Sequence, residues 1–119
     1  MKNKKIVLSE SIARKVLVTV DAGLVSGLGT PEPGKMCVEA AVCFALDLPH
    51  GDNPPCVGRA VRRAKIRLND APWSSGSART KGLRRVAIAQ LGSNKLDQSE
   101  FSKRFVTEVI RQILPIALR

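Results

Sequence analysis

The sequence predicts an all-α protein, a compact single domain of about five helices packed round one buried apolar helix at about residues 35–46. Three observations lead to this fold class. Apolar residues recur at helical spacing in five segments, and no segment alternates convincingly like a strand. Hydrophobic residues make up 44% of the chain, enough for a packed core. The 119 residues fit one domain, 1–119, whose first eight residues form a basic segment able to stay flexible.

The first helix is expected over residues 10–25, with Ser9 as its N-cap. Its inner face is marked by apolar residues that recur every four positions: Ile12, Val16, Val20 and Leu24. Residues 16–20 are rich in β-branched side chains, so a strand there is the alternative.

The second helix is expected over residues 35–46, after the turn-forming run 30–34. Glu39 is its only interior charge, and a helix that is apolar on every side is buried. A buried carboxylate must find a partner or hold its proton. The expected partner is an arginine of the third or fourth helix. The alternative is a functional carboxylate that acts with Asp21 or Asp52.

The third and fourth helices are expected over residues 56–69 and 77–91, the latter capped by Ser77. The inner face of the third consists of Val57, Val61, Ala64 and Leu68. The inner face of the fourth consists of Leu83, Val86, Ala87 and Leu91. Gly92 follows as a stop signal.

The fifth helix is expected to start at Asp97 or Ser99, and Pro115 is expected to kink or end it. Its apolar face consists of Phe101, Phe105, Val109 and Ile113, and further apolar residues follow at Leu114, Ile116 and Leu118. This face is larger than a small core needs, which indicates either a homodimer through the C-terminal helix or a missing downstream partner.

Basic residues are concentrated on the third and fourth helices. The chain has 20 Lys and Arg against 10 Asp and Glu, a net charge of +10. Residues 59–85 hold nine basic residues and one acid, and therefore +8 of that charge. We call these nine the basic cluster: Arg59, Arg62, Arg63, Lys65, Arg67, Arg79, Lys81, Arg84 and Arg85. Arginine binds phosphate through two parallel hydrogen bonds, so the cluster indicates a phosphate-binding surface.

The leading hypothesis is a small intracellular protein that binds nucleic-acid backbone largely without regard to sequence. Its binding residues would be Arg59, Arg62, Arg63, Arg67, Trp73, Arg79, Arg84 and Arg85. Neither helix turns a base-reading Asn or Gln outward, so contacts to phosphate should dominate. The low aromatic content, 3%, excludes sheet platforms that stack bases. The alternatives are a regulatory module that docks on an acidic protein, and a solvated basic face. Trp73 could instead fill the gap between two helices.

The cysteines offer a third alternative, an enzyme that uses Cys37 at a helix start with His50 as its base. We favour the interpretation that Cys37 is a buried apolar residue. This interpretation speaks against an enzyme, but the question stays open at this point. Cys37 and Cys43 are six residues apart and diverge on a helix, so we expect no metal site and no cofactor. An odd number of cysteines and the missing apolar part of a signal peptide predict a cytoplasmic protein. No apolar run reaches transmembrane length, so no membrane partner is expected.

Overall fold

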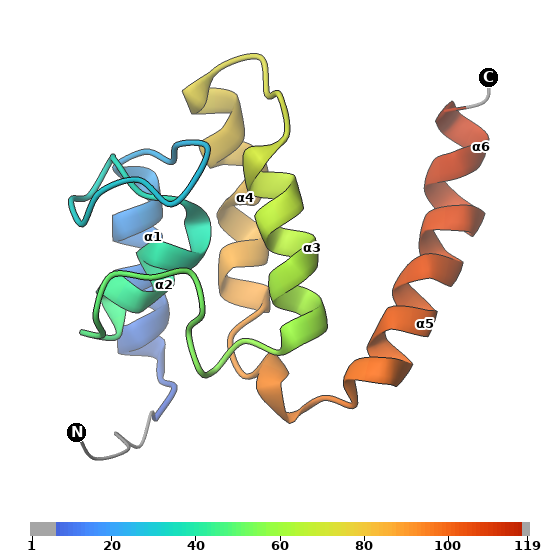
Figure 1. The fold of residues 1–119 in the computed structure, drawn as a ribbon, viewed down its shortest axis with the longest axis horizontal. Coiled ribbons are helices and arrows are strands. Elements are labelled where there is room, and N and C mark those ends of the chain that lie inside the picture. The colour runs from blue at the N-terminus through green and yellow to red at the C-terminus, as the bar shows by residue number, and fades with distance from the viewer. Residues whose placement is uncertain (1–6, 118–119) are drawn as a thin grey trace.

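The computed structural model describes residues 7–117, and this part of the protein is all-α, as predicted (Figure 1). The helices are α1 (Glu10–Asp21), α2 (Val38–Ala45), α3 (Arg59–Asp70), α4 (Gly76–Ala89), η1 (Ser93–Lys95), α5 (Gln98–Glu108), η2 (Val109–Ile113) and α6 (Leu114–Ala117). Within residues 7–117 the only β-type pairing is two isolated bridges. Helices α1 to α4 form a body, and residues 98–117 form a rod that leaves it, which we call the arm (Figure 1).

Helix α2 is the centre of the body, which confirms the prediction of a buried apolar second helix. Every residue of α2 is buried except Phe44. Helices α1, α3 and α4 all contact it. The expectation that four helices surround α2 is wrong for the fifth, because α5 packs on α3 and then diverges from the body (Figure 1).

Helix α1 begins as predicted and ends earlier than predicted. Ser9 accepts a hydrogen bond from the Ile12 N–H at 3.3 Å and is therefore the N-cap. Val16 and Val20 are fully buried in helical conformation, which excludes the alternative strand over residues 16–20. The helix stops at Asp21, and Gly23 then takes a φ of +123°, a value that L side chains rarely adopt.

The connection between α1 and α2 folds back on itself, and this delays the start of α2 from residue 35 to Val38. The Val25 N–H donates to the Met36 carbonyl at 3.0 Å, and the Thr30 N–H donates to the Lys35 carbonyl at 2.8 Å. Residues 35–37 are therefore not helical. The chain crosses closely at Gly29, where a Cβ would collide with the Lys35 carbonyl.

Helix α3 turns a different face inward from the one that apolar spacing predicts. Val61 is buried, but Leu68 is 44% exposed, and the polar residues Lys65 and Asn69 are buried instead. The Asn69 side chain accepts from the Val38 N–H at 3.0 Å and donates to the Val25 carbonyl at 2.8 Å. The buried face of α3 therefore supplies hydrogen bonds to α2 and its loop, which hydrophobic periodicity does not reveal.

Helix α4 starts at Gly76, one residue earlier than expected. Its N-cap is Ser75 rather than Ser77. Leu83 and Ala87 are buried as predicted, whereas Val86 is 37% exposed. The helix is followed by Gly92 with a φ of +86°, in agreement with the predicted stop.

The arm begins with Asp97 as the N-cap of α5, and Pro115 does not end it. The π-helical segment η2 lies just before Pro115. A proline lacks the N–H that would bond one turn back, and a wider turn accommodates the loss. The expected apolar face is not buried, since α5 contains no buried residue. The side chains of Ile113 and Leu114, and residue Leu118, lie outside the described part.

The base of the arm is fixed by the Gln98 side chain. Its Oε1 accepts from the Ala60 N–H at 2.9 Å, and its Nε2 donates to the carbonyls of Ser93 and Leu96 at 3.0 and 2.8 Å. One amide thus joins the start of α3, the η1 turn and the start of α5.

Candidate nucleic-acid interface

The structure divides the basic cluster into residues bound within the fold and residues directed to solvent. Arg62 donates to the Asp52 carboxylate and to its carbonyl, both at 2.8 Å. Arg84 forms two hydrogen bonds to the Asp21 carboxylate, at 2.7 and 3.1 Å. These two arginines connect α3 to the 47–55 loop and α4 to α1, so part of their charge is already neutralised.

Two further members of the basic cluster also have structural roles. Arg79 donates to the Asn69 carbonyl at 2.8 Å and to the Ala71 carbonyl at 3.2 Å, groups that the end of α3 leaves without helical partners. Lys65 is only 4% exposed and points into the body. Neither residue presents a free cation at the surface.

Three arginines at four-residue intervals remain exposed on one face of α3, and we call them the arginine stripe: Arg59, Arg63 and Arg67. Among the described residues, their guanidinium groups form no hydrogen bond or ion pair with the protein. They line one wall of a cleft of about 710 Å³ between α3 and the arm. The opposite wall is polar apart from Val106, and it contains Gln98, Ser99 and Ser102. No acidic side chain lines this cleft within residues 7–117.

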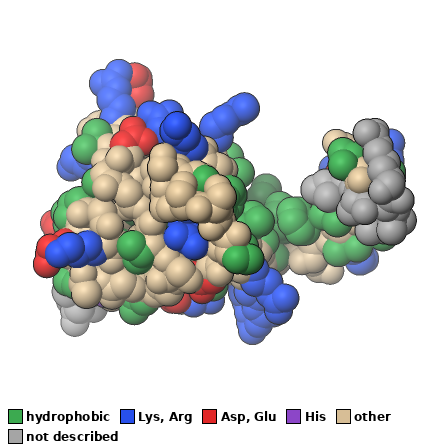
Figure 2. All heavy atoms as spheres, turned by 90° about the horizontal axis from the view of Figure 1, so that it is seen from above, with side chains coloured by type: hydrophobic (Ala, Val, Ile, Leu, Met, Phe, Trp, Pro, Cys, Tyr) green, Lys and Arg blue, Asp and Glu red, His purple; other side chains and the backbone are tan. Residues whose placement is uncertain are grey.

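The space-filling view shows Lys and Arg side chains projecting from the body beside the base of the arm (Figure 2). Arg85 and Lys81 on α4 are exposed as well. The cations available to a partner are therefore the arginine stripe together with these two residues, which is about half of the basic cluster.

Trp73 has a packing role. Its Nε1 donates to the Leu68 carbonyl at 2.8 Å, and its ring packs against the core over Gly82, where a Cβ would collide with the ring. This is the gap-filling position that the sequence left as one of two interpretations. We therefore leave Trp73 out of the binding surface.

The chain matches no protein-family model, no curated protein and no solved structure. Within the described residues, no helix is long and apolar enough to cross a membrane.

Glu39 finds a different partner from the expected arginine. It is fully buried, and its Oε1 accepts from Gln90 Nε2 at 2.6 Å. Burial raises the pKa of Glu39 to about 7, opposed by the hydrogen bond from Gln90 and by the charge of Lys65. Burial likewise lowers the pKa of Lys65 to about 8, opposed by Glu39. These residues from α2, α3 and α4 form one polar cluster inside the body.

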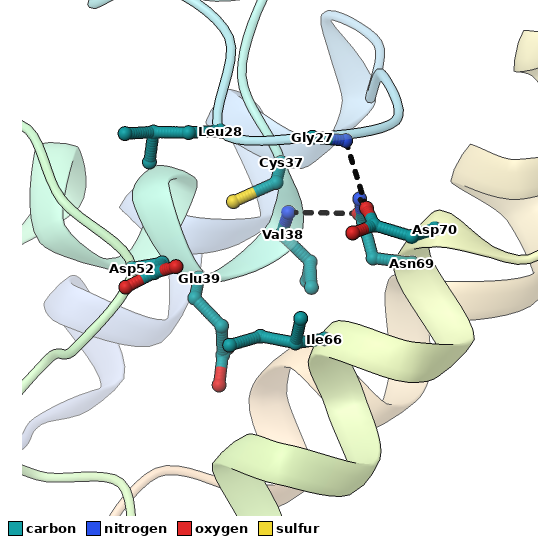
Figure 3. Close-up of a pocket in the computed structure, with 9 residues that line it drawn as sticks. All are labelled: Gly27, Leu28, Cys37, Val38, Glu39, Asp52, Ile66, Asn69 and Asp70. Atoms are coloured by element: carbon teal, nitrogen blue, oxygen red, sulfur yellow. Dashed lines mark hydrogen bonds between the residues drawn. The ribbon is translucent and has the colours of Figure 1, made fainter.

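Cys37 lies at the start of α2, as predicted, and acts as its N-cap, because its Sγ accepts from the Ala40 N–H at 3.4 Å. Burial raises the pKa of the Cys37 thiol, which opposes its use as a nucleophile. Cys37, Glu39 and Asp52 line one small cavity of about 20 Å³ (Figure 3). This volume holds about one water molecule, so the cavity does not admit a substrate.

The other residues considered for chemistry are hydrogen-bonded within the fold or buried. His50 Nε2 lies 3.1 Å from the Gly29 carbonyl and is bonded to it. Cys43 and Cys56 are buried, and burial raises the pKa of the Cys43 thiol to about 11. Within residues 7–117, no three His, Cys, Asp or Glu side chains converge on a point where a metal ion could bind.

Sequence reasoning missed the wall that faces the arginine stripe. Ser99 and Ser102 come from the arm, and nothing in their spacing indicates that the arm lies beside α3. It also missed Gln90 as the partner of Glu39. A glutamine beside the inner-face residues Ala87 and Leu91, at the end of the predicted fourth helix, was the one available signal for such a partner.

Proposed function

We propose that the protein binds nucleic-acid backbone, without reading base sequence, through the arginine stripe and the cleft beside it. The observation that carries this proposal is the cleft itself, which has free arginines on one wall, hydroxyl groups on the other and no acid among the described lining residues. A polyanion gains charge-assisted hydrogen bonds there and meets no repulsion.

The spacing of the stripe supports a phosphate chain as the ligand. Residues four apart on a helix rise about 6 Å, so the three arginines form a row about 12 Å long. The distance between neighbouring phosphates along one strand is similar to the rise of about 6 Å between neighbouring arginines of the stripe. Three guanidinium groups can therefore bind successive phosphates of one strand. Ser99 is available to sugar or base atoms, whereas Ser102 donates its hydroxyl proton to the Gln98 carbonyl and can act only as an acceptor.

The test is fluorescence anisotropy of labelled single-stranded and duplex oligonucleotides over a series of salt concentrations. Each phosphate contact contributes about −0.9 to the slope of log K against log salt for duplex DNA and about −0.7 for a single strand, so three contacts give slopes of about −2.7 and about −2.1. We therefore expect the affinity to fall about 40-fold for the duplex and about 20-fold for the single strand between about 50 and 200 mM salt. Replacing all three stripe arginines with Gln should remove nearly all of the slope of log K against log salt and most of the affinity.

A matched control separates the stripe from net charge. Arg14, Lys35 and Arg104 each pair with a surface acid near in sequence, and Gln at all three positions removes the same formal charge. The control variant should retain most of the binding. Equal loss in both variants, or no binding by the wild-type protein, would contradict the proposal.

The second candidate function is docking on an acidic protein. Val106 lines the same cleft as the arginine stripe and is 56% exposed, so a partner with acidic and apolar side chains would also find matching groups there. A pull-down from nuclease-treated lysate distinguishes the two candidates. A protein retained after nuclease treatment, and released by the stripe variant but not by the control, would favour this second candidate.

A further inference from the structure

The arm presents apolar side chains to solvent where it leaves the body. Val106, Ile110 and Ile116 are 56%, 55% and 60% exposed. Helices η2 and α6 contact each other, and η2 also contacts α5. A single helix of this length is marginally stable in water unless an apolar face is packed. Within residues 7–117, the far half of the arm therefore has no packing partner outside the arm that would stabilise it.

A second free apolar surface lies at the base of the arm. A groove of about 220 Å³ runs between α3, α4 and α5, and its exposed apolar side chains include Leu68, Val86, Leu96 and Phe105. These four are between 37% and 52% exposed. Hydrophobic side chains are visible where the body meets the arm (Figure 2). We call this surface the apolar groove.

The charges around the apolar groove indicate what kind of segment fits it. Among the lining residues that the structure describes, Lys65 is the only charged one, and it is buried beside Glu39. The lining therefore offers no exposed charge to an acidic or a basic partner. An apolar and nearly neutral helix fits best.

The arm is a helix of this kind. It has three basic and two acidic residues, a net charge of +1, in a chain of net charge +10. Arg104 pairs with Glu100, and Arg111 pairs with Glu108, so these charges are largely neutralised within the arm. In a second copy of this strongly basic chain, the nearly neutral arm is therefore the segment that meets the least repulsion at the apolar groove.

We propose that a second copy of this chain fills the apolar groove, so that the arm of each copy lies in the groove of the other. Each copy contributes one arm and one apolar groove. A two-fold axis between the copies places each arm in the groove of the other. An arm cannot fill its own groove, because Phe101 and Phe105 at its base already line it and the far half leads away (Figure 1).

The size of the contact predicts weak association. Residues 106–117 extend about 18 Å, and a helix with side chains is about 10 Å wide, so one face covers about 180 Å². Each contact buries about that area on the arm and again on the groove. Two arm–groove contacts therefore bury about 720 Å² in total, below the roughly 1,200 Å² of stable complexes. We expect a dimer with a dissociation constant in the micromolar range or weaker.

Sedimentation velocity of the full chain over a range of concentrations tests the proposal. The sedimentation coefficient should rise with concentration in the wild-type protein. Ile110→Glu should abolish the rise, whereas Gln112→Glu should not, because it adds the same charge on the opposite side of the arm, where Gln112 bonds to Glu108. A protein that stays monomeric at about millimolar concentration, or equal behaviour of the two variants, would overturn the proposal.

Cross-linking tests the exchange of arms without relying on a disruptive variant. Cysteines are placed at Leu68 in the apolar groove and at Ile110 on the arm, while the three native cysteines are buried. Mild oxidation should yield a covalent dimer on a non-reducing gel. A disulfide within one chain would show that the arm closes on its own body, and the absence of any new disulfide would remove the contact altogether.

Discussion

Replacing Glu39 with Gln should make the stability of the protein much less sensitive to pH between about 4.5 and 7. Glu39 is fully buried, and burial raises its pKa from 4.5 to about 7. In this pH range the folded protein retains a proton that the unfolded chain releases. Folding is therefore progressively opposed as the pH rises, and the wild-type free energy of unfolding falls through this window.

The magnitude follows from the difference in pKa. About 2.5 pKa units, at about 1.4 kcal/mol per unit, correspond to a loss of about 3 kcal/mol by the upper end of the window. Lys65 acts in the opposite sense at higher pH. Its pKa is lowered from 10.5 to about 8, so stability is regained as the pH rises above 8. The wild-type protein should be least stable between about pH 7 and 8.

Urea unfolding followed by fluorescence provides the measurement, because Trp73 is the only tryptophan and packs against the core. The Glu39→Gln variant can keep the hydrogen bond to Gln90, since its Oε1 can accept from the same Nε2. It should show an almost flat profile between about pH 4.5 and 7 and be more stable than the wild type near neutrality.

The control for this experiment is Glu100→Gln, which removes a carboxylate that pairs with Arg104 on the surface. It should keep the wild-type profile, because exposed ion pairs contribute little. If Glu39→Gln showed the same fall in stability as the wild type, the fall would not come from Glu39, and the reasoning from burial would be refuted.

Two further substitutions test the packing of the body. Asn69→Ala removes the buried hydrogen bonds to Val38 and Val25 and should cost about 2–4 kcal/mol in urea unfolding, whereas Asn69→Asp should restore part of the acceptor function at Val38. Gly82→Ala should displace the Trp73 ring, shift its emission to longer wavelength and cost about 1–3 kcal/mol; an unchanged spectrum would show that the ring does not lie on Gly82.

Sequence patterns predicted the all-α class and the central helix because a run of apolar residues has few ways to avoid water. Val16, Val20, Leu83 and Ala87 are buried as their spacing predicted. Helix starts were predictable where a side chain caps them locally, as Ser9 does. Such features depend on residues within about one turn of each other.

The errors arose where a partner distant in sequence decides the structure. Asn69 is buried because it caps a helix 31 residues earlier, and its neighbour Leu68 is turned outward as a result. The prediction that Arg79 and Arg84 bind a partner took no account of the carbonyl and carboxylate groups that they contact within the fold, because the sequence does not reveal them. A helical pattern identifies the outward face of an arginine and does not show which acid or carbonyl lies there.

The three hydrogen bonds of Gln98 have a mechanical consequence for the arm. The 20 residues from 98 to 117 form a rod about 30 Å long that is held at one end. A tilt of about 10° about Gln98 would move the far end by about 5 Å, the height of one helical turn. The arm is thus held only at its base, by the Gln98 amide and by the packing of Phe101 against the core. The width of the cleft beside the arginine stripe therefore depends on the angle between the arm and α3.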